Sequence, residues 1–159
     1  MSNPRDLFLE LLAEALWIER TLAFEVLPQL HREADSELLA APLAEHLEET
    51  REHVERVSAV FVAAGSEPAA AASAALEGLR KQHDIHVEQV VEPRLRDLFL
   101  IDCAARTEGV EAALYTSLIA LAGSLEIDAS DLAKNRGEEE GALRALDDVR
   151  GRLLERVRT

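Results

Sequence analysis

The sequence contains little of several residues that mark other classes of protein. Cys103 is its only cysteine, which excludes an internal disulfide and is typical of a reducing cytoplasm. Aromatic residues make up only 4% of the chain, and β-branched clusters and Gly-Asn turns are few. The longest uncharged apolar stretch covers residues 112–125 and is too short to span a bilayer. The opening MSNPRDLFLELL has no basic region before an apolar run, so we expect no signal peptide and a cytoplasmic location.

Positive charge is also scarce. Lys and Arg number 17 against 31 Asp and Glu, which gives a net charge of −14 at pH 7. A charge this negative argues against nucleic acid and anionic membranes as partners. The chain also lacks a Ser-His-Asp pattern, a phosphate-binding loop and cysteines at zinc-binding spacing.

The residues that are abundant favour helices. Apolar residues make up 48% of the chain, Ala and Leu dominate, and Glu and Arg supply most of the charge. This composition is typical of an all-helical domain. With 159 residues and no linker or low-complexity segment, the chain is expected to form a single domain over residues 1–159.

Apolar residues recur with helical spacing in four long segments and one short one. We expect long helices over about 4–32, 36–64, 93–122 and 128–157, and a short helix over about 74–91. Asn3 and Pro4 are suited to begin the first helix, and Pro28 is expected to kink its last turn. Gly65 and Gly123 are expected to end the second and fourth long helices. The pattern predicts an up-down four-helix bundle with one additional short helix in the crossover.

Each long helix carries a glutamate on or beside its apolar stripe. Glu19, Glu108 and Glu139 lie at the centres of their stripes. In the remaining helix Glu49 lies at the stripe edge, together with His46 and His53. A carboxylate on an apolar stripe is costly unless it is paired or bound to a metal.

The four glutamates lie at matching heights. Glu19 lies about 14 residues before the end of its helix and Glu49 about 12 after the start of the next, a mismatch of about 3 Å. The corresponding mismatch for Glu108 and Glu139 is about 6 Å, within one helical turn. Two antiparallel hairpins therefore bring four acidic side chains together in the core.

Four carboxylates at one depth repel each other, and two interpretations remove the repulsion. Two iron or manganese ions would do so, as in di-metal carboxylate bundles, and open coordination positions would face small oxidants such as oxygen or peroxide. Alternatively, Arg51, Arg106 and Arg136 could pair with the glutamates. A metal-free bundle of that kind would act as an interaction or scaffold protein.

Neighbouring residues could join the site or serve other purposes. His53 and Glu111 are candidate additional ligands. His46 lies at the same edge of the stripe as His53. The alternative for both histidines is that they are boundary residues of an amphipathic helix without a ligand role. Glu111 and Glu140 lie away from the centres of their apolar stripes. Each could be a further ligand, a group that supports a ligand, or an exposed residue. His83 is expected to be a hydrogen-bonded core or boundary residue.

Two helices also carry a second apolar strip, which should form a homodimer interface or hold the short helix. These strips consist of Leu9, Leu16, Trp17, Phe24 and Leu27 in the first helix, and Cys103, Val110, Leu114, Leu118 and Leu121 in the fourth. Tyr115, on the Glu108 stripe, is expected to be packed with one polar contact.

Several sequence elements resemble the YciE/YciF ferritin-like family of bacterial proteins. They are DLFLELLAEALWIERTL, LAEHLEETREHVERV, ALEGL, LIDCAARTEGVEAALYTSLIALA and EEEGALRAL, in that order over nearly the whole chain. The HLEET…VER element is the most specific. The resemblance implies a ferritin-like bundle, stress-related expression and homodimers. It also implies a di-metal site at Glu19, Glu49, Glu108, Glu111 and Glu139, with Glu140 as a further candidate.

The sequence departs from that family's pattern at several positions. Gly109 and Arg144 replace a usual His and Asp, and His53 stands where Gln is common. Ala142, three residues after Glu139, leaves the fifth helix without the Glu-x-x-His pair of the ideal di-metal bundle. These departures favour a metal layer that has decayed, whereas His53 could restore one imidazole ligand.

Overall fold

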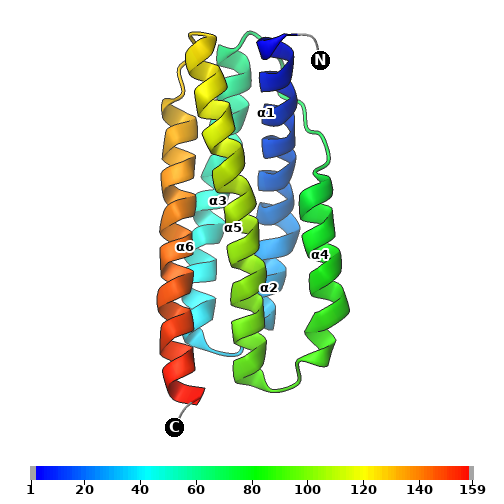
Figure 1. The fold of residues 1–159 in the computed structure, drawn as a ribbon, viewed down its shortest axis with the longest axis vertical. Helices are drawn as coiled ribbons and strands as arrows, with labels where there is room; N and C mark the ends of the chain where they lie inside the picture. The colour runs from blue at the N-terminus through cyan, green and yellow to red at the C-terminus, as the bar shows by residue number, and fades with distance from the viewer. Residues whose placement is uncertain (1–2, 158–159) are drawn as a thin grey trace.

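A computed structural model describes residues 3–157, and within that range all regular structure is helical (Figure 1). The elements are α1 (Pro4–Thr21), the π-helix η1 (Leu22–Val26), α2 (Leu27–Glu33), α3 (Glu37–Ala63), α4 (Ala74–His86), the 3-10 turn η2 (Val87–Gln89), α5 (Pro93–Ser124) and α6 (Ser130–Val157). The predicted all-α fold is therefore confirmed. In the described residues no helix is long and apolar enough to cross a membrane.

The long helices form a bundle of two antiparallel hairpins. One hairpin joins the rod of α1, η1 and α2 to α3, and the other joins α5 to α6 (Figure 1). Across the bundle, α6 packs against α3 and α1 packs against α5. The crossover between the hairpins contains α4, which lies outside the four-helix core and packs against α5. This is the predicted four-helix bundle with one short crossover helix.

The first rod is continuous but changes its winding just before Pro28. Because Pro28 has no N–H and its ring crowds the carbonyl four residues earlier, a regular α-turn is disfavoured there. The chain responds with the π-helical segment η1, at whose end the Leu27 N–H donates to the Leu22 carbonyl five residues back. The distortion expected in the last turn thus lies one turn earlier.

Two helix ends differ from the sequence-based expectation. Gly123 does not end the fourth long helix, since α5 continues through Ser124. The short helix ends at His86 rather than near Val91, and a 3-10 turn follows it. Gly65 does end α3, as predicted, with the left-handed φ of 68° that favours glycine.

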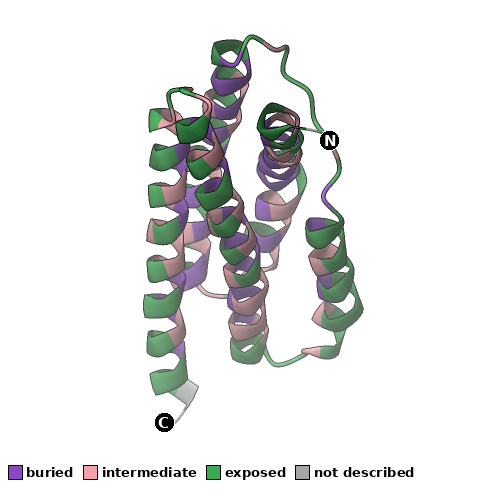
Figure 2. Cartoon of the chain, turned by 45° about the horizontal axis from the view of Figure 1, so that its top comes forward, coloured by how far each residue is buried: buried purple, intermediate pink, exposed green. Residues whose placement is uncertain are grey.

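The apolar core is divided into two clusters, one toward each end of the bundle. One contains Phe8, Leu12, Phe61, Leu118 and Leu132. The other contains Leu22, Leu39, Leu100, Leu146 and Leu153. Every long helix has buried polar residues between these two sets of positions, and α5 has one further buried polar residue, Asp97, near its start. Figure 2 shows the buried residues along the inner faces of the helices. The fold therefore encloses a layer of buried polar side chains between the two apolar clusters.

Candidate metal centre

The buried polar layer receives side chains from all four long helices. Its members are Glu19 of α1; His46, Thr50 and His53 of α3; Glu108 and Glu111 of α5; and Asn135 and Glu139 of α6. On each helix they are spaced three, four or seven residues apart, so they project from one face. Each is 5% exposed or less. The structure thus brings Glu19, Glu108 and Glu139 together, as their matched heights predict.

The first group of potential metal ligands consists of Glu19, His53 and Glu139. His53 Nδ1 lies 2.8 Å from Glu139 Oε1 and 3.3 Å from Glu19 Oε2. One ligand atom from each residue lies within 4.8 Å of the other two. This distance allows all three to bind a single ion.

The second group consists of His46, Glu108 and Glu139. His46 Nε2 lies 3.2 Å from Glu108 Oε1 and 3.3 Å from Glu139 Oε2. These three residues meet the same 4.8 Å criterion. Because Glu139 contributes one oxygen to each group, the two groups are joined by a shared carboxylate.

Each histidine also contacts a third, more exposed glutamate with its other ring nitrogen. His46 Nδ1 lies 3.2 Å from Glu49 Oε2, and His53 Nε2 lies 2.8 Å from Glu138 Oε2. Arg56 in turn donates to Glu138 at 2.6 Å. Outer carboxylates that fix the ring orientation are usual around metal-binding histidines. The arrangement aims one nitrogen of each ring at the inner glutamates.

Most polar atoms that face the middle of the layer have no hydrogen-bond partner. They are both oxygens of Glu111 and Glu139, Oε2 of Glu19 and of Glu108, Nε2 of His46 and Nδ1 of His53. The histidine–glutamate contacts are close enough for ion pairs but lack hydrogen-bond direction. Buried polar atoms left in this state are costly, and bound cations would satisfy them. This donor set of imidazole and carboxylate therefore fits metal ions.

The charges of the layer perturb the pKa values of its members. Burial lowers the pKa of His46, but the negative charge of Glu108 and contacts with Glu49 and Glu139 outweigh it and raise the pKa to about 11. The pKa of His53 rises to about 10, because contacts with Glu139 and Glu19 likewise outweigh burial. Without metal, both imidazoles are therefore protonated at neutral pH.

Burial lowers the pKa of a histidine but raises the pKa of a carboxyl group, and it does so here for three glutamates. Burial and repulsion by Glu108 raise the pKa of Glu139 to about 8. The pKa of Glu19 is raised mainly by burial, and that of Glu111 is raised well above its ordinary value by burial and three neighbouring glutamates. In this layer, carboxyl groups that are protonated or bound to a cation are therefore favoured over carboxylates without a partner.

Tyr115 is buried as predicted, but it makes two polar contacts in the layer rather than the one expected. Its hydroxyl donates to Glu19 Oε1 and accepts from Asn135 Nδ2 at 3.0 Å. Asn135 Oδ1 then accepts from Arg56 at 3.0 Å. This chain of contacts fixes the Glu19 carboxylate and connects it to the rim of the bundle.

Several predicted positions require correction. His46 and His53 are buried, so the edge interpretation is wrong. The proposed arginine partners do not reach the buried glutamates but pair with residues on their own helices: Arg51 with Glu48, Arg106 with Asp102 and Arg136 with Glu140. Glu49 has a side chain 35% exposed and, among the described residues, contacts the layer through His46. Glu111 is buried in the layer, whereas Glu140 is exposed.

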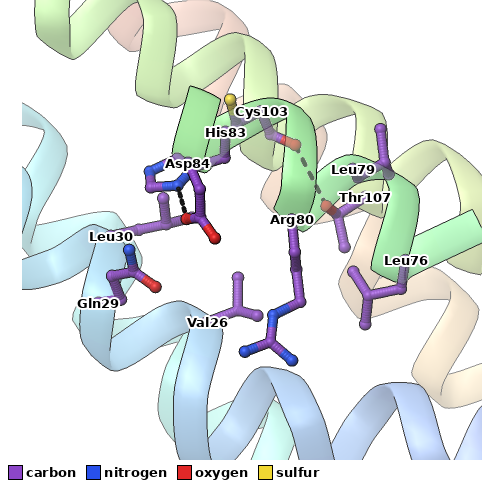
Figure 3. Close-up of a pocket in the computed structure, with 10 residues that line it drawn as sticks. All are labelled: Val26, Gln29, Leu30, Leu76, Leu79, Arg80, His83, Asp84, Cys103 and Thr107. Atoms are coloured by element: carbon purple, nitrogen blue, oxygen red, sulfur yellow. Dashed lines mark hydrogen bonds and ion pairs between the residues drawn. The ribbon is translucent and has the colours of Figure 1, made fainter. Parts of the chain in front are cut away.

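Other residues lie outside the layer or were missed. His83 is buried, as predicted, and contacts Glu33 at 2.7 Å and Asp84 at 3.0 Å beside a cavity of about 30 Å³ under α4 (Figure 3). Cys103 lines the same cavity, so its strip partly holds α4. Glu138 and Arg56 were not predicted as site residues, because both lie beside the apolar stripes.

The departures from the family pattern do not remove any member of the layer. Gly109 and Arg144 are both exposed, and a Cβ on Gly109 would meet no atom within 4 Å. Ala142 lies beside His46 in the lining of a small cavity. The His/carboxylate layer is therefore complete without imidazoles at these positions.

The fold and site define a helical bundle with buried His/Glu clusters that could hold metal ions. The chain belongs to the family described as domain of unknown function DUF892, which matches residues 3–157. It is 31% identical over 144 residues to protein YciF of Escherichia coli K12, covering 89% of this chain and 86% of YciF. The sequence-based resemblance is thereby confirmed.

Two solved structures are similar over nearly their whole length. The crystal structure of the E. coli stress protein YciF has a TM-score of 0.91 and 28% identity, covering 98% of this chain and 99% of that one. YcfI of Rhodopseudomonas palustris has a TM-score of 0.89 and 30% identity, covering 92% and 94% of the two chains. Both likenesses extend over the helices that build the layer.

Proposed function

We propose that this chain is a di-metal carboxylate protein that binds iron or manganese and acts on oxygen or peroxide during stress. The observation that supports this most directly is the shared Glu139, which offers one oxygen to each of two buried ligand groups. The description of its relative YciF as a stress protein supports the physiological context.

The ligands would divide between two ions. Glu19 and His53 would hold one ion, His46 and Glu108 the other, and Glu139 would contact both. Glu111, whose two oxygens are buried without partners, would complete the set, while Glu49 would orient His46 from outside. When bound, such metals supply open coordination positions and redox chemistry toward a small oxidant. The imidazole and carboxylate ligands suit iron and manganese.

The protein's own residues would prepare the site in three ways. Glu49 and Glu138 orient the two imidazoles, and Tyr115 fixes one oxygen of Glu19. The apolar clusters exclude bulk water from the two ends of the layer along the bundle, which leaves the side between α3 and α6 as the open one. Such exclusion strengthens the electrostatic interactions inside the site.

The alternative function is that of a metal-free interaction protein. One observation favours it: two protonated imidazoles beside the buried carboxylates neutralise part of the layer's charge without a metal. The bundle would then be stable by itself, and its function would lie on its surface. The two functions differ in whether a cation other than the proton occupies the layer.

Metal analysis separates these functions. Protein expressed with added iron and manganese and then desalted should retain about two metal ions per chain, as in di-metal bundles. Glu139→Ala should lose most of this metal, because both groups use Glu139. Glu140→Ala is the matched control, since Glu140 is the adjacent but exposed glutamate.

Two results would decide against this assignment. A metal-free parent protein whose unfolding curve is unaffected by iron or manganese would establish the metal-free alternative. Equal metal contents in the parent and Glu139→Ala would show that the ions bind elsewhere.

Leu16 and Leu27 of the apolar strip on the first helix are buried in the core, so the whole strip does not form an interface as predicted. We also propose that the chain forms a homodimer through the part of this strip that stays exposed at Phe24. Phe24 in this strip is 73% exposed, an unusual state for a large aromatic side chain. Sedimentation analysis should show a dimer for the parent and a shift to monomer for Phe24→Glu. A monomeric parent would contradict this proposal.

A further inference from the structure

A groove between α3 and α6 leads from solvent toward the layer. It forms a cavity of about 360 Å³, lined on the α3 side by Glu45, His46 and Glu49 and on the α6 side by Gly137, Glu138 and Gly141. Its lining includes three acidic residues and no Lys or Arg. A concave surface with this charge raises the local concentration of cations.

The inner end of the groove reaches the metal ligands. A second cavity of about 20 Å³ shares His46 and Ala142 with the groove and is also lined by Glu108. His46 is 5% exposed and Glu108 is 1% exposed, and each has a ligand atom, Nε2 or Oε2, without a hydrogen-bond partner. Unsatisfied ligand atoms thus lie at the end of an acidic passage.

Both outer carboxylates of the layer also open onto this groove. Glu49 contacts His46 and Glu138 contacts His53, so each ligand group has one histidine held by a residue of the groove lining. By contrast, the cavity under α4 is lined by no member of the layer (Figure 3). The groove therefore reaches the second group directly through His46 and borders the first group through Glu138, whereas the cavity under α4 reaches neither group.

We infer that the groove between α3 and α6 is the route by which divalent cations reach the buried layer. This inference rests on the proposed function. Carboxylates at the mouth attract the cation, small residues on α6 keep the passage open, and Glu49 with His46 forms its inner end.

Gly141 allows the route to be narrowed without changing a ligand. A Cβ at Gly141 would approach only the Arg144 guanidinium, at 3.8 Å, which is ordinary contact distance. Leucine favours helix more than glycine does, so Gly141→Leu should fold at least as well as the parent. Gly151→Leu is the matched control on α6, because Gly151 has open space around it and lies outside the groove lining.

The experiment adds Mn²⁺ to metal-free protein, quenches samples into a chelator at set times and measures the metal retained. Gly141→Leu should take up Mn²⁺ about tenfold more slowly than the parent, because uptake then requires helix opening. Its final Mn²⁺ content should equal the parent's, and Gly151→Leu should match the parent in both quantities.

The outcomes separate the route from the site. If Gly141→Leu loads as fast as the parent to the same content, the route is wrong and the metal site stands. If the parent itself retains neither Mn²⁺ nor Fe²⁺ in this assay, both the route and the proposed function fail. A slower rate with unchanged content supports the route.

A charge reversal tests the electrostatic part of the inference. Glu45 is exposed at the mouth, so Glu45→Lys should slow Mn²⁺ uptake about two- to fivefold at low salt, and the difference should shrink at high salt. Glu155→Lys changes the net charge equally at an exposed position of α6 outside the groove lining and should have no such effect. Equal slowing by both variants would mean that overall charge, not the groove, sets the rate.

Discussion

At the scale of single residues, the histidines explain how the layer can be stable before metal arrives. Each ring nitrogen of His46 and His53 lies at ion-pair distance from a carboxylate, inner or outer, so the doubly protonated ring is balanced by negative charge on both sides. A metal ion needs one deprotonated nitrogen from each ring. Metal binding should therefore release protons from the same atoms that now contact the inner glutamates.

Tyr115 provides a residue-scale prediction about the metal-free protein. Tyr115→Phe keeps the buried ring but removes the hydroxyl that joins Glu19 to Asn135. Because both partners are buried and lose a hydrogen bond, the free energy of unfolding should fall by about 1–3 kcal/mol. Urea denaturation at pH 7 measures this change. An unchanged midpoint would show that Glu19 does not depend on the hydroxyl.

At this scale the sequence predicted the glutamates better than their partners. A lone Glu at the centre of an apolar stripe is a clear signal, and Glu19, Glu108 and Glu139 are all buried. His46 and His53 lie beside the stripe, and only the packing of α6 against α3 shows that this edge faces inward. Periodicity on one helix cannot report how a neighbouring helix covers its edge.

At the scale of helices, a buried residue on α5 fixes the start of α3. The Asp97 carboxylate accepts the Asp35 and Ser36 N–H groups at 2.8 and 2.9 Å, while the Ser36 side chain makes no capping hydrogen bond. Asp97 thus satisfies backbone donors that a helix start leaves open.

Asp97→Ala should therefore destabilise the protein by about 1–2 kcal/mol, as expected for the loss of a helix cap. Asp102→Ala is the control on the same helix, because the Asp102 side chain is half exposed and pairs with Arg106 one turn along the helix. Its effect on stability should stay within about 0.5 kcal/mol. Thermal unfolding of both variants measures the difference, and equal effects would refute a capping role for Asp97.

Helix positions were predictable because local signals agree with the final packing. Asn3 and Pro4 begin α1, and Gly65 ends α3, where the sequence analysis placed them. The sequence could not predict that η1 is a π-helix. Pro28 indicates that the helix is distorted nearby, but the surrounding packing determines whether the distortion is a kink or a π-helical turn. The predicted helix end at Gly123 was wrong for a related reason, because a helix that is packed along its length can continue past a glycine.

At the scale of the whole molecule, the two hairpins hold a charged layer between two apolar clusters. Because the layer's ionisable groups favour protons, pH should control the stability of the metal-free protein. The pKa of His46 and of His53 is raised from 6.5 to about 11 and about 10, and that of Glu139 from 4.5 to about 8.

A raised pKa stabilises the fold below the group's unfolded-state value, and this stability is lost as the pH rises through the folded-state value. The free energy of unfolding of metal-free protein should therefore fall steadily between about pH 5 and pH 10. Glu138, whose pKa is lowered, acts in the opposite direction only near and below its ordinary value of 4.5. Urea denaturation across this range measures the slope.

Added Mn²⁺ should oppose this loss of stability. Metal binds the deprotonated ligands, so its affinity rises with pH over the range in which the metal-free layer weakens. Stabilisation by a ligand grows with its concentration relative to its dissociation constant, so the difference between metal-loaded and metal-free protein should widen from pH 5 toward pH 8. Glu139→Ala should show no such widening, whereas Glu140→Ala should. A constant difference at every pH would mean that Mn²⁺ binds outside the layer, because surface carboxylates are already ionised over that range.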